Sequence, residues 1–76
     1  MEQDVFYQGH DLKAERGVET AVRCKAVCLQ HPKCVGWSWV SYEYNIVGAR
    51  GNCHVKSKME NGMEFLGIVS GQVQYC

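Results

Sequence analysis

Five cysteines in a chain of 76 residues restrict the fold more than any other feature of the sequence. In so short a chain, this density usually indicates a disulfide framework, which forms and persists only in an oxidising compartment. The hydrophobic core of a domain this small is marginal, so covalent links between its elements are expected. Because the number of cysteines is odd, one thiol has no partner within the chain.

The remaining composition is that of a globular domain, with 46% hydrophobic residues, 21% charged residues and a formal net charge of zero. Without a basic face, nucleic acid and anionic membranes are poor partners. No apolar stretch approaches the roughly 20 residues that span a bilayer, so no membrane insertion is expected. The first residues lack the apolar core of a signal peptide. We interpret residues 1–76 as one domain from a larger secreted multi-domain protein, with Met1 an expression start.

Hydrophobic periodicity predicts one helix and five or six strands, which is an α+β fold with an antiparallel sheet. Thr20 is the expected N-cap of a helix over residues 21–31, and Pro32 ends it. Period-two alternation and turn residues place the other elements. We expect strands over 4–7, 11–14, 35–40, 42–47 and 53–57, then a loop over 58–65 and two short strands over 67–71 and 72–75.

Helical spacing decides which cysteines can pair. Cys24 and Cys28 lie one turn apart with parallel Cα–Cβ vectors, which disfavours a bond between them. Cys34 follows the helix end and can fold back to Cys28, which leaves Cys53 for Cys24. Structural zinc sites favour two closely spaced ligand pairs, whereas Cys34 and Cys53 are 19 residues apart. We therefore expect disulfides, with no metal and no other cofactor.

Strand alternation predicts which side chains share a face of the sheet. If Cys34 is tied to the helix, every second residue after it also faces the helix. The same rule applies to the strand that Cys53 opens. The residues between these positions then form one cluster on the far face of the sheet: Trp37, Trp39, His54 and Lys56.

Four motifs occur in a family-like order: GHDL at 9–12, C-x3-C-x5-C-x-G-W-S at 24–38, CHVKS at 53–57 and GIVSG at 67–71. Together they resemble the PAN/apple module, in particular the apple domains of microneme adhesins and lectins from apicomplexan parasites of the Toxoplasma, Eimeria and Sarcocystis kind. The resemblance covers nearly the whole chain. It implies an antiparallel sheet of about five strands cradling one α-helix, with the same two bridges, Cys24–Cys53 and Cys28–Cys34.

The sequence departs from the family pattern at one cysteine. Many apple domains have a third disulfide between the first and last strands. Cys76 matches the C-terminal member of that pair, but no cysteine precedes Cys24. Cys76 is therefore expected to be unpaired, or paired outside this segment.

The resemblance implies a binding function. Apple domains bind proteins or carbohydrates, and several parasite members are galactose-type lectins that are stored in the microneme and then secreted. We therefore expect an extracellular adhesion module that binds a galactose-like glycan of the host cell during attachment and invasion. Sugar recognition needs an aromatic ring and a few fixed polar groups. The candidate binding residues, led by the lysine, are Lys56, His54, Tyr42, Tyr44 and Trp39.

Alternative interpretations remain open. Trp37 and Trp39 are better explained as core residues under the terminal strands than as a ligand platform, and Lys56 can be an ordinary surface lysine. A protein-binding apple module without a sugar site would use an exposed apolar patch, for which residues 63–69 are the candidates. Its partners would be a host or parasite surface protein, or other domains of the parent adhesin. A concave site lined by Lys56, His54 and a tyrosine would favour sugar, whereas a flat apolar surface would favour protein.

An enzyme is not expected, because the sequence has no paired-carboxylate motif, no Gly-x-Ser-x-Gly and no phosphate-binding loop.

Overall fold

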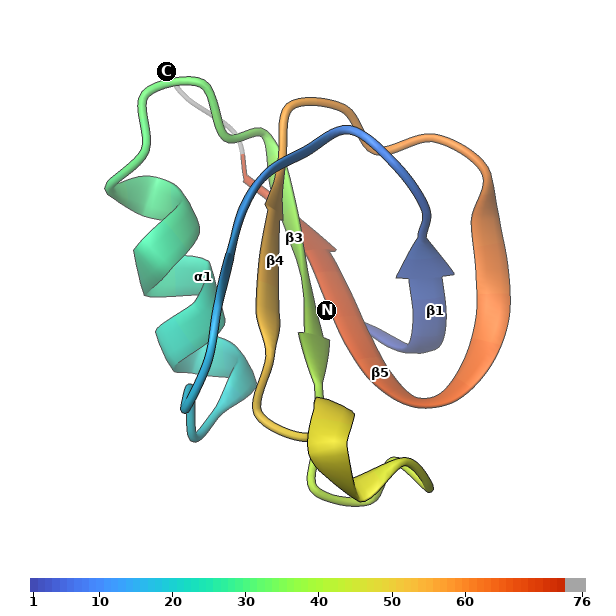
Figure 1. Ribbon diagram of the computed structural model, residues 1–76. Coiled ribbons are helices and arrows are strands. Elements are labelled where there is room, and N and C mark those ends of the chain that lie inside the picture. The colour runs from blue at the N-terminus through green and yellow to red at the C-terminus, as the bar shows by residue number, and fades with distance from the viewer. Residues whose placement is uncertain (74–76) are drawn as a thin grey trace.

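The computed structural model describes residues 1–73 and shows one helix packed against an antiparallel sheet (Figure 1). In chain order the elements are β1 (Glu2–Tyr7), β2 (Asp11–Glu15), α1 (Ala21–Leu29), β3 (Gly36–Val40), the 3-10 helix η1 (Val47–Ala49), β4 (Cys53–Lys56) and β5 (Gly62–Gln72). The five strands lie in the order β1-β5-β3-β4-β2. The α+β class and the helix-on-sheet arrangement are confirmed.

The helix begins where the sequence predicts. Thr20 has an extended backbone, and its side-chain oxygen accepts a hydrogen bond from the Arg23 N–H at 3.1 Å. This bond satisfies one of the amides that a first helical turn leaves without a partner. The helix ends at Leu29, two residues before the expected end, and the turn that follows carries the chain past Pro32.

Two disulfides join the helix to its surroundings. Cys24 bonds to Cys53 of β4, and Cys28 bonds to Cys34 in the turn before β3, with 5.4 Å between the Cα atoms in each pair. All four half-cystines are fully buried. Both expected pairings are confirmed. The prediction for Cys76 falls outside the described residues.

Residues 42–47 do not form the expected strand. The backbone turns after Ser41, whose carbonyl accepts from the Tyr44 N–H at 3.2 Å and whose hydroxyl accepts from the Glu43 N–H at 3.2 Å. Both edges of β3 are already occupied by β4 and β5. The chain therefore leaves the sheet after β3 and returns to β4 through η1.

The C-terminal part of the described chain also differs from expectation. Residues 62–72 form one long strand, β5, in place of the end of the expected loop and the short strand over 67–71. The strand expected over 72–75 lies partly outside the described residues. Two glycines lie within this strand, β5. Gly67 bends it with a φ of 90°, and a Cβ at Gly71 would lie 2.6 Å from the ring of Trp37. Gly67 therefore allows a bend inside the strand, and Gly71 allows the strand to pass close to the Trp37 ring.

The two tryptophans face the helix, which corrects the predicted far-face cluster. Trp37 lies opposite Val55 and Trp39 opposite Cys53 in the β3–β4 pairing. Trp37 is only 1% exposed and packs in the core with the half-cystines. The prediction was wrong because Cys34 lies in a turn before β3, so the alternation starts only with the first residue of the strand.

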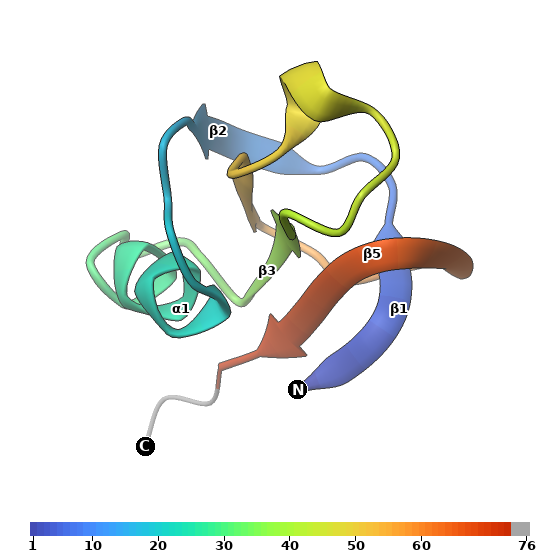
Figure 2. The same cartoon turned by 90° about the horizontal axis from the view of Figure 1, so that it is seen from below.

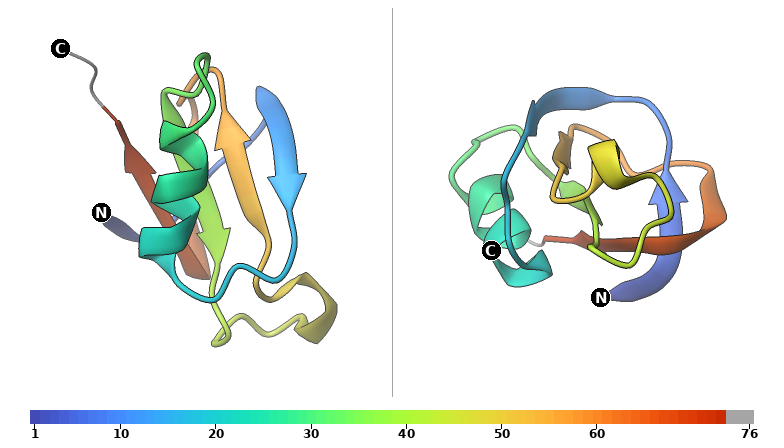
Figure 3. Two further views of the ribbon diagram at one scale, coloured as in Figure 1. Left: turned by 90° about the vertical axis from the view of Figure 1, so that its left-hand side faces the viewer. Right: turned by 60° about the horizontal axis from the view of Figure 1, so that its bottom comes forward.

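The sheet is strongly curled, so its far face is partly enclosed (Figures 2 and 3). Strands β1 and β4 are separated by two strands in the sheet order. Nevertheless, the ring of Phe6 in β1 lies edge-on to His54 in β4, with 6.3 Å between ring centroids. A buried hydrogen bond of 2.7 Å joins the hydroxyls of Ser38 and Ser70 on this face. The interior of the curl is thus packed by a small set of aromatic and polar side chains.

Candidate functional site

Lys56, the first candidate for sugar binding, is fully buried inside the curl of the sheet. Its ammonium forms an ion pair with Asp11, donates to the Gly9 carbonyl at 3.2 Å and lies 4.9 Å from the centroid of the Phe6 ring. Buried ammonium groups need such partners to offset the loss of water. Lys56 therefore belongs to the packing of the far face and not to an open groove.

His54 shares the far face with Lys56, as the alternation predicts. Its side chain is 23% exposed, and Nδ1 lies 3.9 Å from a carboxylate oxygen of Asp11. Burial lowers the pKa of His54 below its ordinary value, an effect that the Asp11 charge opposes and the Lys56 charge reinforces. The imidazole is therefore neutral at neutral pH.

Two other predicted residues, Trp39 and Tyr42, do come together in an open groove. Their rings meet edge to face, with 6.1 Å between centroids. The indole N–H of Trp39 donates to the Val18 carbonyl at 2.9 Å, which fixes the ring, while Tyr42 is half exposed. We call this space of about 390 Å³ the aromatic groove. It is lined by Met1, Gln3, Asp4, Ala21, Trp39, Ser41, Tyr42, Glu43, Gly67 and Val69.

The carboxylate of Asp4 is held in the aromatic groove by an irregularity of β1. Asp4 has a φ of 60°, and the pairing of β1 with β5 shifts register between Gln3 and Val5. Such a bulge redirects one side chain, and here Asp4 accepts a hydrogen bond from the Gly67 N–H at 2.9 Å. Backbone strain of this kind often marks functional sites.

Sequence reasoning missed the polar part of this groove. Gln3 and Asp4 lie far along the chain from Trp39 and Tyr42, and only the pairing of β1 with β5, which is also next to β3, brings them close. Glu43 follows Tyr42 directly, but an acidic residue in a turn carries no specific signal. No local motif connects these residues, so only the strand order reveals the set.

Tyr44, the remaining predicted residue, lines a different groove. This space of about 500 Å³ lies between the 43–46 turn and residues 64–66 of β5. We call it the acidic apolar groove. It is lined by Glu43, Tyr44, Asn45, Ile46, Glu64, Phe65 and Leu66. The five predicted sugar-binding residues are therefore divided among three places.

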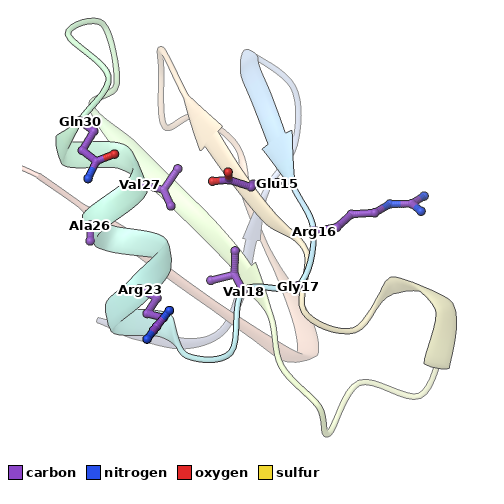
Figure 4. Close-up of a pocket in the computed structure, with 8 residues that line it drawn as sticks. All are labelled: Glu15, Arg16, Gly17, Val18, Arg23, Ala26, Val27 and Gln30. Atoms are coloured by element: carbon purple, nitrogen blue, oxygen red, sulfur yellow. The ribbon is translucent and has the colours of Figure 1, made fainter.

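A further groove of about 440 Å³ separates β2 from the helix (Figure 4). Val18 and Val27 point into this space, whereas the Arg16 side chain extends away from the helix. Charged groups of both signs, Glu15 and Arg23 among them, surround it. None of the predicted sugar-binding residues lines it.

Across residues 1–73, no group of three or more His, Cys, Asp or Glu side chains is placed to hold a metal ion. The same part of the chain contains no helix that is long and apolar enough to cross a membrane.

Comparison with known families gives one match. The family model for the PAN domain matches residues 5–56, which is 52 of the 76 residues. The match includes both disulfides, the helix and strands β2, β3 and β4. PAN domains are binding modules for proteins or carbohydrates, are generally not enzymes, and in this disulfide-rich form fit an extracellular protein. A comparison with curated proteins finds no match.

Proposed function

Because the chain belongs to the PAN domain family, we propose that it is an extracellular adhesion module that binds a galactose-type glycan in the aromatic groove. The observation that carries this proposal is that the paired rings of Trp39 and Tyr42 line the same groove as the acidic residues Asp4 and Glu43. The likeness of the sequence motifs to apicomplexan adhesins supports the biological part of the proposal. In that setting the protein is stored in the microneme, secreted, and used in attachment to host cells.

The chemistry of the groove suits a pyranose. A sugar ring presents a patch of C–H groups that packs on an aromatic face, and hydroxyls at its edge that need fixed polar partners. Tyr42 offers an exposed ring beside the fixed indole of Trp39. Galactose has an axial 4-hydroxyl, which leaves a continuous C–H patch on one face of the ring for this contact.

The hydroxyl partners are already in place. The Gly67 N–H bonds to one oxygen of Asp4 and so orients the carboxylate before a ligand arrives. Ser41 is tied to the turn by accepting from the Glu43 N–H. Groups that are fixed in advance lose less conformational entropy on binding. The volume of about 390 Å³ falls within the range of about 300–1,000 Å³ that is usual for small-molecule sites.

In this proposal Lys56 and His54 do not contact the sugar and affect binding only through the shape of the sheet. Their contacts with Asp11 and Phe6 shape the curl of the sheet on the face opposite the helix. Replacing Lys56 should therefore change stability without removing a ligand contact.

Saturation-transfer NMR on galactose, with glucose as the comparison sugar, tests this assignment. Tyr42→Ala should abolish the transfer from the protein to galactose, because it removes the exposed ring of the aromatic groove. Tyr44→Ala is the matched control, since the same change is made two residues away in a different groove, and it should leave the transfer unchanged. Equal transfer in the wild type and Tyr42→Ala would refute the aromatic groove as the site.

A further inference from the structure

Exposed apolar side chains gather on two segments that lie beside each other. Ile46 and Val47 follow the turn after β3, and Met63, Phe65 and Leu66 lie in the first half of β5. Val47 and Leu66 are 70% and 74% exposed, so these two side chains contribute little to the core. Phe65 is less exposed, and its ring also packs edge-on against Phe6. The two segments form the end and one side of the molecule away from the helix (Figures 1 and 2). An apolar surface of this kind marks an interaction site.

A backbone hydrogen bond joins the two segments, since the Ser41 N–H donates to the Gly67 carbonyl at 2.8 Å. Within the first segment, the Arg50 side chain donates to the Tyr44 carbonyl at 2.6 Å and so fixes the turn itself. Gly67 lies so close to Tyr44 that an added Cβ would be 2.8 Å from the Tyr44 Cα. The acidic apolar groove between the segments is therefore preformed, which lowers the entropic cost of binding.

The charges at this groove select the partner. Both charged side chains among the described residues that line it, Glu43 and Glu64, are acidic. The chain as a whole has no net charge, so this local excess is a feature of the groove. A groove lined by apolar side chains and two acidic ones is complementary to an apolar side chain flanked by cations.

We propose that the acidic apolar groove docks a segment of a partner protein in which an aliphatic or aromatic residue is flanked by Lys or Arg. Ile46, Phe65 and Leu66 contact the apolar side chain, and Glu64 faces the cation. This surface is distinct from the aromatic groove, with which it shares only Glu43. A protein partner and a glycan can therefore be recognised by the same domain through different residues.

Selection from a library of random twelve-residue peptides displayed on phage tests the proposal directly. The wild-type domain is the target, and the double variant Ile46→Ser/Leu66→Ser removes peptides that bind elsewhere. Both side chains are largely exposed, so the variant should fold. We expect enriched peptides to contain Lys or Arg next to Leu, Ile, Phe or Trp. One such peptide, labelled with fluorescein, then serves as the probe in anisotropy titrations.

The titrations give three expected results. Ile46→Ser/Leu66→Ser should weaken binding of the labelled peptide by about tenfold or more, as for the centre of an interface. Glu64→Gln should weaken it by about threefold and reduce its dependence on salt. Val22→Ser, which removes an equally exposed apolar side chain from the helix, should have no effect.

Several outcomes would overturn the proposal. They are a selection without any enriched motif, enrichment of acidic peptides, or peptides that bind the Ile46→Ser/Leu66→Ser variant as well as the wild type. Wild-type self-association that this variant abolishes, seen by sedimentation, would assign the surface to a second copy of the chain instead. Saturation transfer to galactose should be the same in this variant and the wild type, so the two proposals can fail independently.

Discussion

The two disulfides should contribute unequally to stability because they close loops of different length. Cys24 and Cys53 are 29 residues apart, whereas Cys28 and Cys34 are 6 apart. Chain entropy then gives about 3.6 kcal/mol for the long loop and about 2.2 kcal/mol for the short one. All four half-cystines are fully buried, so the cost of losing a buried sulfur is similar in both pairs. The difference of about 1.4 kcal/mol between the two contributions is therefore attributed to loop length.

Urea unfolding followed by tryptophan fluorescence measures this difference. The variants are Cys24→Ala/Cys53→Ala and Cys28→Ala/Cys34→Ala, each made with Cys76→Ser so that no stray thiol can exchange. The reporter is suitable because Trp37 is in the core. We expect the first variant to have the lower free energy of unfolding, in a domain whose total is of the order of 5–15 kcal/mol. A second variant as unstable as the first, or less stable, would refute the loop-length argument.

Further predictions concern the far face and the bend in β5. Asp11→Asn should lower the free energy of unfolding in urea by about 3 kcal/mol, because it leaves the fully buried Lys56 ammonium without its counter-ion. Lys56→Met should lower it by less, because the half-exposed Asp11 carboxylate that it leaves behind can regain water. Gly67→Ala should cost about 2 kcal/mol or more in thermal unfolding, because φ is 90° there and the adjacent turn leaves no room for a Cβ. Burial lowers the pKa of His54 below 6.5, so near that pH the unfolded chain binds a proton that the folded chain does not. Stability should therefore fall as the pH is lowered through 6.5. His54→Gln should flatten this fall, measured by urea unfolding at each pH.

The local parts of the fold were predictable from the sequence. Thr20 and Pro32 bracket the helix because capping and ring sterics act within a few residues. The pairing of Cys24 with Cys53 followed from one helical turn of spacing and a process of elimination. These are short-range constraints, and the structure confirms them.

The longer-range parts were not predictable in the same way. The strand expected over 42–47 is absent because both edges of β3 are occupied. The pattern of residues 42–47 alone cannot indicate which edges of the sheet are occupied. Trp37 and Trp39 were assigned to the wrong face because Cys34 lies before the strand, and a single irregular residue inverts an alternation argument. The aromatic groove depends on Asp4, whose position comes from a bulge in β1 and from pairing across the sheet. Lys56 was identified from a motif, but only the curl of the sheet shows that it is buried.

The most direct test of the account is a titration of the ¹⁵N-labelled domain with galactose, followed by amide and indole NMR shifts, with glucose as the control. The account predicts galactose-specific shifts at the indole N–H of Trp39 and at the amides of Asp4, Tyr42 and Gly67, while Lys56 stays unchanged. Shifts centred on Lys56 and His54, or no shifts with galactose at all, would contradict it.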